Sequence, residues 1–184
     1  MDGILIRIYN PNIFFNAPPG IIILLAAIFF IMPSCRIKYS LTGASISPNV
    51  KTVAISQFPN NAALVVPTLS RTVTNSIRDY FTSQTNLVLV DRIGDITLDG
   101  AITQYFTQPV AIQGNETAAM NRLTIALSVK FTNKTDPKQN WESTFTRYQD
   151  YPSTYNLSSV QDELIKQITD QLVQDIFNKA VVNW

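Results

Sequence analysis

A regular alternation of apolar and polar residues runs through Asn121–Asn133 and constrains the fold more than any other feature of the chain. Successive side chains of a β-strand point to opposite faces of its sheet, so an alternation of this length predicts a strand with one buried face. The residues expected on the buried face are Leu123, Ile125, Leu127, Val129 and Phe131, and those expected on the polar face are Thr124, Ala126, Ser128 and Lys130.

Four further segments are expected to pair with this strand or lie near it. Asp95–Thr107 also alternates, and Trp141–Tyr148 returns as a strand after a turn at Thr132–Asn140. The short connections predict that these strands form an antiparallel meander. Lys51–Gln57 is expected as the first strand of the domain. Asn86–Asp91 is a nearly continuous apolar run, which favours a buried strand.

Two segments have the apolar spacing of amphipathic helices. Thr68–Ser83 repeats apolar residues every three or four positions and follows Pro67, a residue suited to the start of a helix. The apolar residues between positions 160 and 181 form a wider stripe, and Ser158 or Ser159 is expected to cap that helix. The predicted order is β-α-β-β-β-β-α. It indicates an α+β two-layer sandwich, with two helices packed on one face of a mixed, mostly antiparallel sheet.

The N-terminal stretch Ile21–Met32 holds twelve consecutive apolar residues. A membrane-spanning helix needs about 20 such residues, whereas a shorter run is typical of the apolar core of an export signal. The run leads into Met32-Pro33-Ser34-Cys35, which resembles the lipid-attachment box of bacterial lipoproteins. Residues 1–34 are therefore interpreted as a lipoprotein-type signal peptide, with an uncleaved membrane anchor as the competing interpretation.

Cys35, the only cysteine of the chain, is the expected site of lipid attachment. Its thiol would carry diacylglycerol, and the new α-amino group would accept a further acyl chain such as palmitate. Two or three acyl chains anchor a protein durably, whereas one is marginal. Residues 35–49 would then be a lipidated tether, and residues 50–184 the folded domain.

The composition argues against several classes of function. The chain has no histidine and one cysteine, which excludes a histidine-assisted nucleophile, a histidine metal site and a cysteine-rich zinc site. No metal or other cofactor is expected. A net charge of +1 is too balanced for a general nucleic-acid binder. Asp95 and Asp99 would lie roughly 13 Å apart along an exposed strand face, which is too far for shared acid–base chemistry.

Two features remain as candidates for function. The segment Pro109–Asn121 is long for a hairpin connection, and long loops are often either functional or variable surface. Basic residues also gather at or near one strand and its turn, where they could meet phosphates or simply solubilise the surface. These residues are Arg122, Lys130, Lys134 and Lys138.

Long stretches of the chain resemble the LptE family of lipopolysaccharide-assembly lipoproteins, in its divergent form. They are YSLTGASISPNVKTVAISQFPNNAALVVPTLS, PVAIQGNETAAMNRLTIALSVKFTN and LSSVQDELIKQITDQLVQDIFNKAVVNW. The resemblance covers essentially all of residues 35–184, and it implies two helices packed on a sheet. It also implies a non-catalytic role at the periplasmic face of the outer membrane. There an LptE-like protein plugs the β-barrel LptD, assists its assembly and helps to deliver lipopolysaccharide to the cell surface. The partners implied are an LptD-type barrel, lipopolysaccharide and the membrane through the lipid anchor. The resemblance assigns no lipopolysaccharide-contacting positions, so the candidates for that contact rest on their charge alone: Arg122, Lys130, Lys134 and Lys138.

Two other classes of protein compete with this interpretation. The pattern KTVAISQFPNN, followed by a helix and NLVLVDR, also resembles periplasmic domains of the CsgG and TolB amino-terminal types. Those domains serve secretion pores or envelope scaffolds. A hydrolase or lipid-modifying enzyme is the third hypothesis. The missing histidine and the lack of a nucleophile motif disfavour it.

Overall fold

The computed structural model describes residues 46–110 and 119–182. The expected signal peptide, Cys35 and most of the expected tether lie outside these residues, as does much of the Pro109–Asn121 connection. The described chain builds a five-stranded sheet in the order β2-β1-β3-β4-β5. Its strands are β1 (Thr52–Ile55), β2 (Val88–Val90), β3 (Ile96–Val110), β4 (Met120–Asn133) and β5 (Trp141–Pro152).

Strand pairing confirms the mixed, mostly antiparallel sheet. β1 pairs in parallel with both β2 and β3, whereas β3, β4 and β5 form the expected antiparallel meander. β3, β4 and β5 are longer than the apolar patterns predicted, because ladder pairing continues through Val110 and Pro152 after the alternation fades. The turn between β4 and β5 contains a short 3-10 helix, η2 (Pro137–Gln139).

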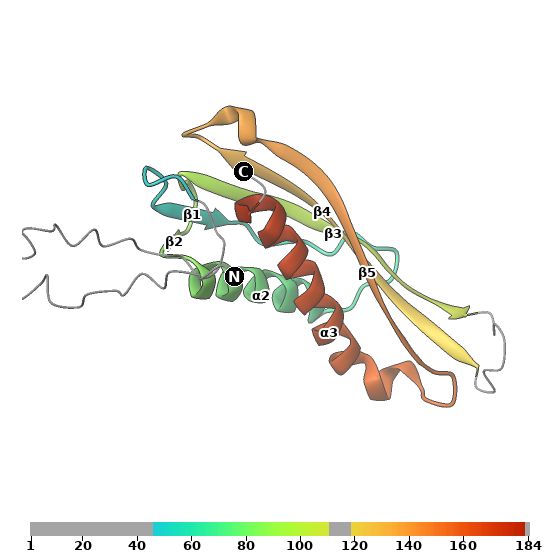
Figure 1. Cartoon of the computed structure of the whole chain (residues 1–184). Helices are drawn as coiled ribbons and strands as arrows, with labels where there is room; N and C mark the ends of the chain where they lie inside the picture. Colours follow the sequence, from blue (N-terminus) through green and yellow to red (C-terminus); the bar gives the residue numbers. More distant parts are fainter. Residues whose placement is uncertain (1–45, 111–118, 183–184) are drawn as a thin grey trace, which may run out of the picture. The chain divides into compact units, whose positions relative to one another are not determined.

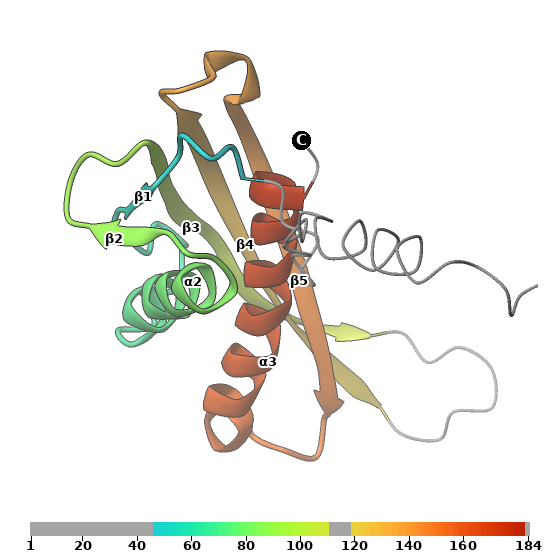
Figure 2. The same ribbon diagram turned by 60° about the vertical axis from the view of Figure 1, so that its left-hand side comes forward.

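Two helices cover one face of the sheet and confirm the sandwich. They are α2 (Leu69–Gln84) and α3 (Leu157–Phe177), and α3 continues into a π-helical turn, η3 (Asn178–Val182). Both lie on the same side of the sheet in Figures 1 and 2. The helix-facing residues of β4 are at most 1% exposed, as the alternation predicted; they are Leu123, Ile125, Leu127, Val129 and Phe131. The core therefore lies between this sheet face and the two helices.

Aromatic contacts join the two helices to each other. The Phe177 ring of α3 meets the rings of Tyr80 and Phe81 of α2 edge-on, with a centroid distance of 5.1 Å in each pair. Such pairs add about 0.5–1.5 kcal/mol each beyond the area that they bury. These contacts fix how the helices lie against each other on the sheet.

A strand forms within Asn86–Asp91 as expected, but the expectation that it is buried is wrong. β2 occupies only Val88–Val90 and lies at one edge of the sheet, where Val88 is 62% exposed and Leu89 40% exposed. A short apolar run does not reveal whether its strand is central or at an edge, because edge position depends on which partners the rest of the chain supplies.

The N-terminal cap of α3 also differs from the expectation. The cap is Asn156, whose side-chain oxygen accepts a hydrogen bond from the Ser158 backbone N–H, and not Ser158 or Ser159. The Ser159 hydroxyl instead donates to the Asn156 carbonyl oxygen. Asn156 keeps an extended backbone, whereas the serines already lie inside the first helical turn.

A β-bulge in β3 changes its alternation near the middle of the strand. The register with β4 shifts between Ile102 and Gln104, so Thr103 is the extra residue. The Thr103 hydroxyl donates to the Ala126 carbonyl oxygen at 3.2 Å. Because of the bulge, both Ile102 and Tyr105 face the helices, and both are buried.

Candidate functional site

The sheet face turned away from the helices is the candidate functional surface, and we call it the open face. Register places its residues in rows across β3, β4 and β5. From the β4–β5 turn towards the far end of the sheet, these rows are Asp99-Lys130-Glu142, Ala101-Ser128-Thr144, Gln104-Ala126-Thr146, Phe106-Thr124-Tyr148 and Gln108-Arg122-Asp150. The face thus has charged rows near its two ends and small or neutral side chains between them.

Thr124 does not contribute the exposed hydroxyl that the alternation predicted. It is 7% exposed, and its neighbour on the same face, Ala126, is 1% exposed. Longer side chains flank them: Phe106 on β3 and Tyr148 on β5 stand on either side of Thr124 and are 39% and 48% exposed. The middle of the open face is therefore uncharged, with two aromatic side chains beside Thr124, and the charged side chains lie towards the ends.

Arg122 lies at the end of the open face that is remote from the β4–β5 turn. Its Nε and Nη2 donate to the two carboxylate oxygens of Asp150 at 2.7 and 2.8 Å, and its guanidinium lies 3.6 Å from the centre of the Tyr148 ring. The hydrogen bonds from Arg122 hold the pKa of Asp150 below its usual value, and Asp150 in turn raises the pKa of Arg122. The charge of Arg122 is thus already shared with a carboxylate and an aromatic ring.

The other three basic candidates gather at the opposite end. Lys130 is exposed on β4, Lys134 follows the end of that strand, and Lys138 lies on η2. Arg122 is eight residues from Lys130 along the same strand, which corresponds to roughly 26 Å. The structure therefore divides the four residues into a separate Arg122 and a group of three lysines, which we call the turn lysines.

The two aspartates that could resemble catalytic carboxylates have structural contacts. The Oδ2 of Asp95 accepts hydrogen bonds from the Lys51 N–H, the Thr52 N–H and the Thr52 hydroxyl at 2.8, 2.9 and 2.8 Å. The Ser56 hydroxyl donates to Asp99 at 2.5 Å. Both carboxylates thus join β1 to the start of β3. Within the described residues, no group of three or more potential metal ligands occurs.

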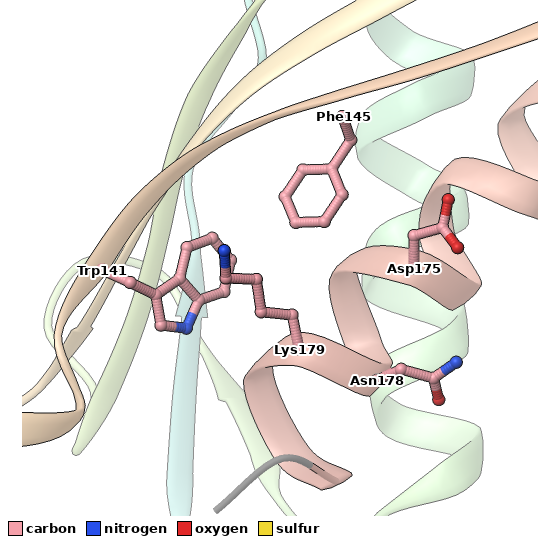
Figure 3. Close-up of a pocket in the computed structure, with 5 residues that line it drawn as sticks. All are labelled: Trp141, Phe145, Asp175, Asn178 and Lys179. Atoms are coloured by element: carbon pink, nitrogen blue, oxygen red, sulfur yellow. The ribbon is translucent and has the colours of Figure 1, made fainter.

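A cavity that sequence reasoning missed lies between β5 and the end of α3. Its volume is about 550 Å³, and Trp141, Phe145, Asp175, Asn178 and Lys179 line it. Figure 3 shows the Lys179 side chain extending from the helix towards the Trp141 ring. The pairing of Trp141 and Phe145 on one side of a strand was visible in the sequence, but the end of α3 that completes the cavity depends on helix packing.

Contacts of Lys179 organise this cavity. Its Nζ donates to the Ser143 hydroxyl at 2.6 Å and lies 5.0 Å from the centre of the Trp141 ring. Asp175 is occupied by Arg147 of β5, whose Nε and Nη2 donate to it at 2.6 and 2.8 Å. Among the described residues, no carboxylate forms an ion pair with Lys179. The cavity therefore combines aromatic walls with one cation that has hydrogen-bonding capacity to spare.

In the part of the chain that the structure describes, no helix has the length and apolar character needed to cross a bilayer.

Comparison with known proteins gives one family. The family model described as "LptE: Lipopolysaccharide-assembly" matches residues 50–180. That range contains all five strands and both helices, α2 and α3. No curated protein sequence matches the chain.

Several solved structures have a similar fold at low sequence identity. A minor lipoprotein from Acinetobacter baumannii is 14% identical with a TM-score of 0.48, and the match covers 71% of this chain and 91% of that one. A hypothetical protein from Chlamydia trachomatis is 9% identical with a TM-score of 0.46, with 73% and 98% covered. A protein from Xanthomonas campestris is 12% identical with a TM-score of 0.47, with 72% and 87% covered. At these scores the likenesses carry no argument about function.

Proposed function

Because the chain belongs to the LptE family of lipopolysaccharide-assembly proteins, we propose that it is a non-catalytic lipoprotein of the outer membrane. In this role it plugs an LptD-type β-barrel, assists the assembly of that barrel and helps to move lipopolysaccharide to the cell surface. The observation that carries the proposal is the family match over residues 50–180, which includes the whole sheet.

The open face supports a role in which the domain contacts the inside of a barrel and catalyses no reaction. A domain that fills part of a hydrated barrel needs a surface that water and polar groups tolerate, and the open face is rich in threonine, serine and glutamine. The absence of histidine from the chain and the backbone contacts of Asp95 favour a non-catalytic role. Acyl chains on Cys35 would hold the domain at the periplasmic mouth of the barrel.

Co-purification tests the partner. The tagged full-length chain is purified from detergent-solubilised membranes, and the proteins that accompany it are identified by mass spectrometry. We expect a large outer-membrane β-barrel in stoichiometric amount. Recovery of a homo-oligomeric ring without such a barrel would instead favour the secretion-pore class and contradict the proposal.

We propose that the turn lysines, and not Arg122, are the basic residues that bind the phosphate groups of lipopolysaccharide. They lack the bidentate carboxylate contact that occupies Arg122, and each is exposed. Cation–phosphate contacts in an exposed setting are weakened by salt. Binding at this site is therefore expected to be stronger at low ionic strength.

A charge-removal series tests this assignment on the full-length protein. The triple variant Lys130→Gln, Lys134→Gln, Lys138→Gln is expected to bind purified lipopolysaccharide several-fold more weakly than wild type, with a smaller dependence on salt. The matched control is Lys166→Gln, which removes an exposed cation from α3 at the opposite side of the sheet. Equal losses in the triple variant and the control would remove the turn lysines from the proposal.

A further inference from the structure

The cavity between β5 and the end of α3 has a positive charge that its own residues do not balance. Asp175 at its rim is already paired with Arg147 through two hydrogen bonds. The ammonium group of Lys179 has three N–H donors, and the Ser143 hydroxyl accepts one of them. Within the described part of the chain, no carboxylate forms an ion pair with Lys179. The cavity therefore keeps one cation with donors to spare.

The walls of the cavity are aromatic, and other contacts hold them in place. The Trp141 and Phe145 rings meet edge-on with their centres 5.8 Å apart, and Phe131 stacks on Trp141 at 5.5 Å. Both wall residues remain partly exposed. A flat aromatic group placed there can pack against them, since aromatic rings pair at centroid distances of about 4.5–7 Å. Walls that are fixed before binding also reduce the entropy lost when a ligand enters.

Lys179 and Ser143 together offer donors to one carboxylate. The Ser143 hydroxyl oxygen accepts from Nζ of Lys179 at 2.6 Å and keeps its own proton to donate. Because the two groups are neighbours, they can each donate to a different oxygen of the same carboxylate. A single cation matches a monoanion, whereas the second negative charge of a phosphate would lie unbalanced near Asp175. Figure 3 shows the end of the Lys179 side chain at the Trp141 ring, where the carboxylate would bind.

Two further features of the cavity are typical of ligand sites. Its volume of about 550 Å³ falls within the range of about 300–1,000 Å³ that small-molecule sites occupy. The turn that carries Lys179, η3, is π-helical, a geometry that is rare in proteins and frequent at functional sites. Neither feature depends on the charge of Lys179, so both support a ligand site independently of it.

We propose that this cavity binds a small aromatic carboxylate. The carboxylate accepts hydrogen bonds from Lys179 and Ser143, and the ring of the ligand packs against Trp141 and Phe145. The site lies on the helix-facing side of β5, whereas Lys130 of the turn lysines lies on the open face. The inference goes beyond the function proposed above, because filling a barrel requires no small ligand. Its failure would leave that function untouched.

Titration of the full-length chain in detergent micelles with a fluorinated probe tests the proposal. The probe is 4-(trifluoromethyl)benzoate, followed by fluorine NMR, with protein-free micelles as the blank. 4-(Trifluoromethyl)benzamide has the same ring without the charge. We expect saturable binding of the benzoate, at least about tenfold tighter than that of the benzamide, because hydrogen bonds to charged groups are the stronger ones. Added salt should weaken benzoate binding and leave benzamide binding unchanged.

Variants of the full-length chain locate the binding. Lys179→Gln should weaken benzoate binding about tenfold, because the charged donor is lost, and should change benzamide binding by less than about twofold. Ser143→Ala should weaken benzoate binding several-fold, since one of the donors is lost. Lys179→Arg keeps the charge and should stay within about threefold of wild type. Lys166→Gln, which removes an exposed cation from α3, is the matched control and should bind as wild type does.

Circular dichroism and thermal unfolding of each variant report whether the fold is retained. A loss of benzoate binding in folded Lys179→Gln and Ser143→Ala, with Lys166→Gln unchanged, supports the site. Equal affinities for the benzoate and the benzamide in wild type would overturn the proposal, and so would the absence of saturable benzoate binding. An unchanged benzoate affinity in Lys179→Gln would also overturn it. Comparison of the two ligands on wild type requires no variant, so the test holds even if a variant fails to fold.

Discussion

Asp95 joins two parts of the chain that are 43 residues apart, because its carboxylate accepts two hydrogen bonds from Thr52, the first residue of β1. Its backbone N–H in turn donates to the Thr52 hydroxyl at 2.9 Å. The hydrogen bonds from Lys51 and Thr52 favour the charged form and lower the pKa of Asp95 below its usual value. The carboxylate thus holds β1 beside β3 at the point where parallel pairing begins.

Replacement of Asp95 by asparagine is expected to lower the melting temperature at neutral pH and to remove a pH-dependent part of the stability. A carboxylate whose pKa is lowered by folding stabilises the fold above its unfolded pKa, which is about 4. That contribution is lost as the pH falls through the lower folded-state pKa. The melting temperatures of wild type and Asp95→Asn should therefore converge below about pH 4 in thermal unfolding scans.

Asp91→Asn, at an exposed site in the same loop, is the matched control. It should follow the wild-type curve at every pH. A gap between wild type and Asp95→Asn that stays constant down to acid pH would show that the charge of Asp95 contributes nothing.

Gly100 is required by a close approach within the sandwich. A Cβ atom at this position would overlap the Phe58 ring and the Ser128 carbonyl oxygen. Phe58 is fully buried, so its ring has little room to move. We expect Gly100→Ala to lower the free energy of unfolding by about 1–3 kcal/mol, in the range of overpacked cores, as measured by urea denaturation.

Ala101→Ser provides the comparison, since Ala101 is partly exposed on the open face. Its effect should stay within about 0.5 kcal/mol. If both variants unfold at the wild-type urea concentration, the overlap predicted at Gly100 is relieved by local shifts.

At the scale of elements, α3 depends on its cap as well as on its apolar stripe. Asn156→Ala removes the oxygen that accepts from the Ser158 N–H and is expected to cost about 0.5–2 kcal/mol of unfolding free energy. Ser158→Ala, at the position that the sequence suggested as a cap, should cost less because the Ser158 backbone N–H is retained. Chemical denaturation of both variants measures their free energies of unfolding. A larger loss of unfolding free energy in Ser158→Ala than in Asn156→Ala would contradict the cap assignment.

The elements also differ in how much their sequence reveals. β4 and α3 could be predicted because each has a long, regular apolar pattern, and in each the apolar residues are buried. The short run at β2 has too few residues for periodicity to separate an edge strand from a central one. Nothing in the sequence around Thr103 predicts the bulge, because the bulge depends on the register in which β3 pairs with β4.

At the scale of the whole molecule, Cys35 is the residue on which membrane attachment is expected to depend. It lies outside the described residues, so its role remains a prediction from its position after Ile21–Met32. Cys35→Ala should weaken membrane association because the acyl chains are lost. The fold should be retained because the family match begins only at residue 50.

Membrane fractionation with carbonate or salt washes measures this effect, and circular dichroism of the recovered protein reports the fold. An equally firm membrane association in the Cys35→Ala variant would refute lipidation as the anchor. It would favour instead the uncleaved apolar segment.

The fold class, the order of the elements and the family could all be predicted from the amino-acid pattern, since long periodic segments and long matching stretches carry that information locally. Sequence reasoning also identified the four basic candidates, but it grouped Arg122 with the three lysines as one cluster. Only the tertiary structure separated Arg122 from the turn lysines, because strand rise and cross-strand pairing fix distance and neighbours. The same holds for the cavity beside β5: its walls come from β5 and the end of α3, more than twenty residues apart, and packing alone brings them together.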